Sequence, residues 1–343
     1  MAENRFNKDI GRHSVVFETP VYVRGYACVG GKKEGEGPMG ECFDLIEQDP
    51  YFGQNTWEKA ESRMQELAMT YALHKAQCEV KDIKYLFAGD LLGQLMATSF
   101  SVNKIEIPLF GVYGACSTFG EAIGLASMAI DGGFAGNTMA LTSSHFSGAE
   151  KQFRFPLDYG NQRPRSSTWT VTGAAGIVLS NSRHGSNVCI KGITTGHIED
   201  YGIKDSMNMG ACMAPAAASL IECHLDEWDV TPDYYDKIVT GDLGKIGKKI
   251  LIDMLMAKGI NIAGNHMDCG IEIYDCKEQD SHCGGSGCAC SACVLCSFLL
   301  KKLERGEYKR ILFVPTGALL SGTSFNEGSS IPAIAHGVVF ERI

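Results

Sequence analysis

The segment Gly114-Ala115-Cys116-Ser117-Thr118 places a cysteine directly before a run of small and apolar residues. That run, 119–130, carries such residues on every face, which predicts a helix buried in the middle of the molecule. A cysteine at the head of such a helix lies near unpaired backbone N–H groups and the positive end of the helix dipole. Both lower the pKa of a thiol, so Cys116 is a candidate nucleophile or the floor of an anion site. A structural cysteine at a tight turn is the alternative.

A second group of cysteines lies within 283–296, and part of it has the spacing C-x-C-x-x-C-x-x-C. This spacing is typical of an iron–sulfur or zinc site. The repeat described next instead places these cysteines on a buried helix, where they replace other small residues. Cluster ligands usually lie on a loop that wraps the metal, so we predict no metal and no cofactor. The cysteines concerned are Cys283, Cys288, Cys290, Cys293 and Cys296.

The chain repeats itself at about half its length, which predicts two similar halves. Three pairs of segments match in the same order: 84–90 with 236–242, 114–143 with 287–316, and 174–180 with 335–341. The first pair ends in Gly-Asp in both copies, so Asp90 and Asp242 are structural equivalents. We place the halves at 1–183 and 184–343, with an insertion over about 145–170 that has no counterpart and could shape a pocket.

Strands and helices alternate between these anchors, which predicts an α/β fold with right-handed crossovers and helices on both faces of the sheets. Asn55 and Glu58 have the form of a capping box at the start of an outer helix. The methionines at 207, 209 and 213 are interpreted as core filling.

The composition excludes several classes of protein. A formal charge of −9 without a basic stripe argues against nucleic acid as a partner. No apolar run is long enough to span a bilayer, and the first residues lack the apolar region of a secretory signal. We therefore expect the protein on the cytoplasmic side, where most of its 14 cysteines would be small buried hydrophobes.

Gly-Ala-Cys-Ser, Gly-Ala-Ala-Gly-Ile-Val-Leu (173–179) and the two-half repeat resemble the thiolase and ketoacyl synthase superfamily. The resemblance implies a five-layer αβαβα fold with central mixed sheets and buried helices, and a homodimer formed by joining the central sheets. More narrowly, the chain from Val16 onward resembles the stage V sporulation protein AD family. Blocks at 86–92, 129–135, 142–145, 171–173, 214–218, 284–291 and 334–342 carry this likeness.

That family resemblance implies a protein of spore formation that binds dipicolinic acid, with or without calcium, for uptake into the developing spore. It also implies small membrane proteins of the same uptake system as partners, and peripheral association with the membrane of the developing spore. The alternative is an acyl-CoA or acyl-carrier acyltransferase that uses Cys116. A scaffold with a vestigial pocket is a third possibility.

Acyl transfer by such enzymes needs histidine or asparagine partners for the cysteine. In the ketoacyl synthase relatives, one histidine follows the strand that corresponds to 237–240, where this chain has Gly241 and Asp242. The second partner would fall in the turn that here reads Gly285-Ser286-Gly287. Both are missing, so the sequence favours binding without catalysis.

Dipicolinate is a planar dianion, so its site should combine N–H donors, hydroxyl groups, a cation and a flat apolar slot. The helix head at Cys116 would supply the donors, and Arg154 the charge, unless it is a solvated surface residue. Asp90 would fit only if calcium enters with the ligand; otherwise it is a turn residue bonded to local N–H groups. Hydroxyls could come from Ser143, Ser144 and Ser286. The remaining candidates are His145, His266 and His336, although a lone histidine is more often structural.

Overall fold

The computed structural model describes residues 10–103, 105–153 and 162–343. In the first half the elements are β1 Ser14–Gly31, α1 Lys32–Gly35, β2 Leu45–Glu47, α2 Trp57–Ala76, β3 Tyr85–Asp90, α3 Met96–Val102, β4 Leu109–Gly111, α4 Thr118–Asp131, β5 Asn137–Ser144, α5 Phe146–Phe153, β6 Trp169–Thr170 and β7 Gly173–Ser180. In the second half they are β8 Val188–Thr195, α6 Met209–Glu227, β9 Lys237–Thr240, α7 Gly244–Ala257, β10 His266–Asp268, α8 Cys269–Glu272, β11 Gly285–Ser286, α9 Cys288–Val294, a π-helical turn η6 Leu295–Leu299, α10 Leu300–Glu304, β12 Arg310–Val314, β13 Thr316–Ala318, α11 Gly322–Asn326 and β14 Ala333–Arg342.

The two halves share one strand order. Outward from the junction of β1 with β8, the first half runs β1-β7-β5-β3-β4 and the second runs β8-β14-β12-β9-β10. In each half the first two pairings are antiparallel and those further out are parallel. The long strand β1 joins the halves, because its start pairs with β8 while its later part pairs with β7. This confirms the predicted fold class of two repeated α/β halves with mixed sheets.

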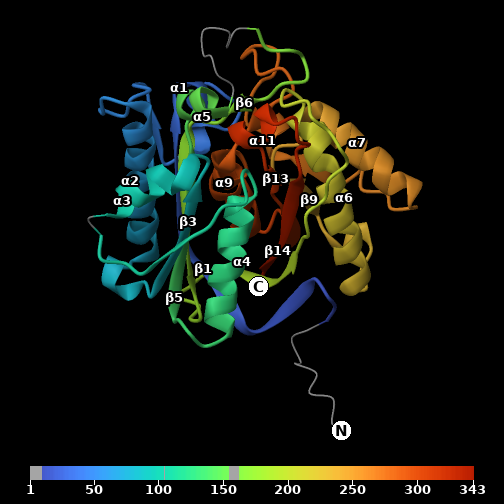
Figure 1. Cartoon of the computed structure of the whole chain (residues 1–343). Helices are drawn as coiled ribbons and strands as arrows, with labels where there is room; N and C mark the ends of the chain where they lie inside the picture. The colour runs from blue at the N-terminus through green and yellow to red at the C-terminus, as the bar shows by residue number, and fades with distance from the viewer. Residues whose placement is uncertain (1–9, 104, 154–161) are drawn as a thin grey trace.

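The elements form five layers, and Figure 1 shows them from one side to the other. Helices α2 and α3 cover the outer face of the first half, and α6 and α7 cover that of the second. Helix α4 lies between the halves, where it packs against β3 and β5 on one side and β14 on the other. The α9–η6–α10 segment shares this middle layer and contacts β1, β5 and β7.

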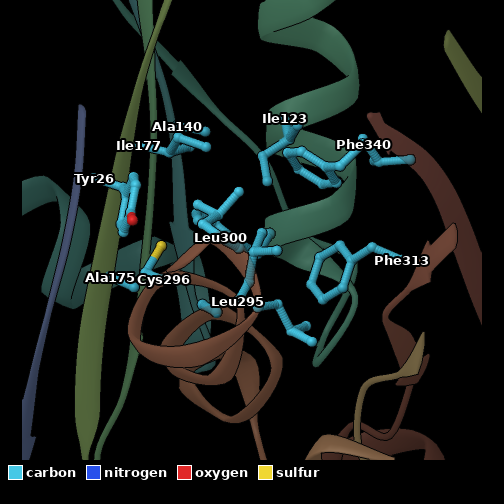
Figure 2. Close-up of a cluster of buried hydrophobic side chains, with 14 of the residues drawn as sticks. Tyr26, Ile123, Ala140, Ala175, Ile177, Leu295, Cys296, Leu300, Phe313 and Phe340 are labelled. Carbon is cyan, nitrogen blue, oxygen red and sulfur yellow. The ribbon is translucent and has the colours of Figure 1, made fainter. Parts of the chain in front are cut away.

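The middle layer has a large buried core of its own. Five large side chains of this core are fully buried: Ile123 of α4, Leu295 and Leu300 of the second buried helix, and Phe313 and Phe340 of the second half's sheet. Figure 2 shows these side chains converging with Ala140, Ala175 and Ile177 from the first half's sheet. The buried helix predicted over 119–130 is therefore α4, and small residues on its faces let two sheets approach it.

Local details differ from the sequence predictions at two places. The N-cap of α2 is Thr56, whose hydroxyl accepts from the Lys59 N–H, so the predicted capping box at Asn55 and Glu58 is wrong by one residue. The repeated segment 287–316 does not end in one continuous strand: β12 stops at Val314, and Thr316 begins the separate strand β13 after Pro315, which has no N–H for the ladder. Within the described residues, no helix has both the length and the apolar character needed to cross a bilayer.

Replacing Phe313 tests the middle layer as the main stabilising core. Phe313→Ala should lower the free energy of unfolding by about 3–5 kcal/mol, because the ring is fully buried between the sheet and the central helices. Chemical denaturation followed by circular dichroism measures this change. The control Phe325→Ala removes the same ring from a site that is 46% exposed, and should cost far less. Equal losses in the two variants would contradict the layered core.

Candidate functional site

The turn before α4 holds Cys116 in a fixed geometry. Ala115 has a left-handed backbone, with φ of 50°, which turns the chain sharply just before the cysteine. The neighbouring N–H groups are already used: Ser117 N donates to Gly114 O at 3.0 Å, and Thr118 N donates to Ala115 O at 3.2 Å. The helix head therefore offers fewer free donors than the sequence predicted.

Cys116 opens into a pocket whose empty volume is about 520 Å³, including its open mouth. The pocket lies where the heads of α4 and α9, the start of α6, and the turns after β3 and β9 meet. Most of its wall is apolar, and the polar groups sit together near Cys116. The lining residues are Leu91, Tyr113, Ala115, Cys116, Ala149, Phe153, Thr170, Met209, Met213, Asp242, Ser286, Gly287, Ala318 and Leu320.

Asp242 is the ionisable acid of this pocket, and it is only 1% exposed. Its carboxyl accepts from Gly287 N at 3.0 Å and from the Thr316 hydroxyl at 3.1 Å, and it faces the Cys116 thiol. Burial, helped by the charge of Asp268, raises the pKa of Asp242 to about 7, although hydrogen bonds from the Cys116 thiol, Gly287 N and the Thr316 hydroxyl oppose the rise.

The Cys116 thiol is correspondingly hard to ionise. Burial first, and then the neighbouring Asp242 carboxyl, raise the pKa of Cys116 well above its ordinary value, and the Gly287 N–H opposes this only in part. The prediction that the helix head lowers this pKa is therefore wrong. Desolvation and a facing acid outweigh a dipole whose nearest N–H groups are already bonded.

At this site each half places an aspartate near a cysteine of the other half. Asp242 of the second half faces Cys116 of the first, while the charge of Asp90 in the first half contributes to raising the pKa of Cys288 in the second. The second pair is closed: Asp90 and Cys288 are both fully buried, and the Cys288 thiol donates to Ala115 O at 3.0 Å. One pair thus faces a pocket, whereas Asp90 and Cys288 belong to the core.

Asp90 does not line the pocket. Its carboxyl accepts from Leu92 N at 2.8 Å, Thr98 N at 2.8 Å and the Thr98 hydroxyl at 2.6 Å. These contacts match the alternative interpretation of a turn residue that bonds local N–H groups. Its neighbour Leu91 reaches the pocket instead.

Of the three candidate serines, only Ser286 lines the pocket. Ser143 is buried against α2, where it donates to Glu61 Oε1 at 2.8 Å. Ser144 lies below the pocket, donates to Val171 O at 2.7 Å and accepts from Ala289 N at 3.2 Å. Arg154 lies outside the described residues, so the structure assigns it no position.

None of the three candidate histidines is among the described lining residues of the pocket. His145 is buried, with its ring bonded to Pro50 O at 2.8 Å, and the ring of His266 bonds the Thr240 hydroxyl at 3.0 Å. His336 lies in a separate groove beside Gly120 and Glu121. Burial lowers the pKa of all three, to about 3 for His266 and about 4 for His336, so each is neutral near pH 7.

The cysteines of 283–296 face different neighbours. The thiol of Cys290 donates to Gly241 O at 3.4 Å, whereas that of Cys293 lies 3.9 Å from Val29 O and from Ala174 O. Cys288, Cys290 and Cys293 lie on α9 and Cys296 on η6, within the buried helical segment that the repeat predicts, whereas Cys283 precedes β11. The thiols of Cys290 and Cys293 lie against separate backbone carbonyls. Over the part of the chain that the structure describes, no three His, Cys, Asp or Glu side chains are grouped to hold a metal ion.

Solved structures of condensing enzymes have the same fold. OleA from Xanthomonas campestris matches with a TM-score of 0.58 at 14% identity, covering 95% of this chain and 99% of that one. The 3-oxoacyl-[acyl-carrier-protein] synthase III of Aquifex aeolicus VF5 matches with a TM-score of 0.56 at 14% identity, covering 94% and 99%. At this identity the likeness establishes the thiolase-like fold alone.

The sequence comparisons are more specific. The family model of stage V sporulation protein AD matches residues 11–341. The stage V sporulation protein AD of Bacillus subtilis (strain 168) is 43% identical over 332 residues, which is 97% of both chains. This chain belongs to the stage V sporulation protein AD family. The resemblance seen in the sequence is thereby confirmed.

Several residues that line the pocket are not among the candidates that the sequence offers. The repeat makes Asp242 the equivalent of Asp90, but only the fold shows which of the two lines the pocket. Met209 and Met213, interpreted as core filling, form part of the wall. The Gly241-Asp242 pair, where the ketoacyl synthase resemblance implies a histidine, is the signal in the sequence that points to Asp242. Other lining residues without a sequence signal are Tyr113, Phe153, Thr170 and Leu320.

The thiol environment makes a kinetic prediction. At about pH 8, iodoacetamide should alkylate Cys116 at least about tenfold more slowly than the half-buried loop residue Cys276, because little Cys116 is ionised. Peptide mass spectrometry over time gives both rates. Asp242→Asn should speed up modification of Cys116, whereas Asp90→Asn should leave it unchanged. Preferential alkylation of Cys116 in the unmodified chain would contradict the assigned environment.

Proposed function

We propose that this protein binds dipicolinic acid, pyridine-2,6-dicarboxylic acid, in the Cys116 pocket without catalysing a reaction. Its role is uptake of this compound into the developing spore, beside small membrane proteins of the same system. Membership of the stage V sporulation protein AD family supports the biological setting. The observation that carries the non-catalytic part is the buried carboxyl of Asp242 beside the Cys116 thiol.

Acyl transfer by Cys116 requires a thiolate and a group that stabilises the developing oxyanion. The pocket opposes both, because an acidic group faces the sulfur and the candidate histidines bond elsewhere. In its ionised form, a carboxyl in this position disfavours added negative charge on the acyl oxygen. What remains is a mainly apolar pocket with a few convergent polar groups, which is the usual form of a small-molecule site.

The wall suits a planar ring. Phe153, Met209, Met213 and Leu320 provide flat or adaptable apolar surface, and methionine sulfur packs well against aromatic rings. Hydroxyl groups of Thr170 and Ser286 lie in the same pocket; that of Ser286 can donate to a ligand carboxylate, whereas that of Thr170 donates to Glu150 Oε1 at 3.5 Å. Ser286 and Thr170 come from the neighbouring strands β11 and β6, which pair in parallel and hold the two hydroxyls in one register.

Isothermal titration calorimetry with dipicolinate, with and without calcium, tests the proposal. We expect binding at one site per chain, and Ser286→Ala should weaken it about tenfold by removing one hydrogen bond to a charged group. The control Ser329→Ala changes the same side chain at an exposed position and should leave the affinity unchanged. Absence of binding under both conditions would refute the proposed function.

Incubation with acyl-CoA, followed by intact mass measurement, tests the enzymatic alternative in the same preparation. We expect no stable adduct. A mass increase that is lost in Cys116→Ala would favour an acyltransferase over a binding protein.

We also propose that two copies pair through strand β4, the edge strand of the first half. Leu109 and Phe110 are 39% and 51% exposed there, so an apolar edge with unpaired backbone groups faces solvent. Light scattering coupled to size exclusion should give a dimer, and Phe110→Glu should give a monomer. The control Tyr201→Glu, at a side chain that is 63% exposed in the second half, should remain a dimer. A monomeric unmodified chain would refute the pairing.

A further inference from the structure

The pocket has an unusual charge balance for a site that would hold a dicarboxylate. Among its described lining residues Asp242 is a carboxylic acid, and none is a lysine, arginine or histidine. A ligand carboxylate placed near an ionised Asp242 would meet repulsion that the dry, apolar wall does little to screen. This inference rests on the proposed function, and it concerns how the same pocket avoids repulsion between Asp242 and the ligand.

The groups that face Asp242 are neutral donors or further acids. Three thiols lie around it: Cys116 at the head of α4, Cys290 on α9 and Cys269 on α8. The further carboxylic acid is Asp268 of β10. Thr316 of β13 contributes a hydroxyl. The Asp268 carboxyl accepts hydrogen bonds from Leu243 N, Gly244 N and the Thr240 hydroxyl, so these donors are already used and are not available to Asp242. No cation on these elements is available to balance a second negative charge in the described structure.

We propose that Asp242 is protonated in the complex and donates its proton to a ligand carboxylate, so that the pocket takes up one proton with each dicarboxylate. A carboxylic acid and a carboxylate then share a single hydrogen bond where two anions would repel. The geometry allows this, because the Gly287 N–H and Thr316 hydroxyl hold the carboxyl from the protein side while it still lines the pocket.

The electrostatics of the free protein support this step. Because burial raises the pKa of Asp242 to about 7, a large share of Asp242 carries its proton near neutral pH before the ligand arrives. Affinity should then be level below about pH 6 and fall about tenfold for each pH unit well above 7, since each binding event must recover one proton. Acidification therefore promotes loading, and alkalinisation promotes release.

Calorimetry of the full chain with dipicolinate, between about pH 6 and 9 and with a calcium chelator present, tests the proposal. At about pH 8, titrations in two buffers of different ionisation enthalpy should give an uptake close to one proton per ligand. This measurement needs no variant. Asp242→Asn should bind with little dependence on pH and without proton uptake, because the amide cannot ionise. The matched control Asp90→Asn changes the buried, pseudo-equivalent residue and should keep the wild-type slope.

Three outcomes would overturn the inference. Binding of equal strength from pH 6 to 9 without proton uptake would refute it while leaving the proposed function intact. Binding only when calcium is supplied would show that a cation, and not a proton, neutralises Asp242. If dipicolinate fails to bind at every pH, the proposed function and the inference both fail.

Discussion

Burial of two helices between the two halves of one continuous sheet is the constraint on which the rest of this structure depends. A helix in the middle layer has little contact with solvent, so α4 and the α9–η6–α10 segment are built mainly from small and apolar residues, and Leu125 and Met128 are the α4 hydrophobics that reach the surface. Their heads lie at the pocket, where backbone groups are bonded locally. The pocket forms where these heads meet the turns after β3 and β9, and its character follows from this dry setting.

Loss of solvent changes the acidity of the Cys116 thiol and of the Asp242 carboxyl. At an exposed helix head a cysteine becomes more acidic, but at Cys116 the loss of solvent and the facing acid dominate. The same loss of solvent makes Asp242 a weak acid that shares its population between the protonated and ionised forms near pH 7. The thiolase-like fold is therefore combined with a thiol at its centre that is hard to ionise.

The sequence was sufficient for the fold and insufficient for the details of the site. Repeated segments specify the two halves, and the small-residue run after Cys116 specifies a buried helix, because these features depend on local pattern and internal symmetry. Which of two equivalent aspartates reaches the pocket depends on what covers each one. Asp90 is bonded to the first turn of α3, whereas Asp242, though buried, lines the pocket, a difference set by loop packing that no local pattern encodes. None of the three candidate histidines is among the described residues that line the pocket, and their flanking residues could not show this, because proximity in three dimensions is not visible there.

The pairing of groups across the halves has a consequence for how the molecule is held together. Cys116 and Asp242 belong to different halves of the repeat, and so do Asp90 and Cys288. The thiol of Cys288 also donates to Ala115 O, directly beside Cys116 in the first half. The base of the pocket is therefore a junction between the halves, and loss of either thiol removes a contact across that junction.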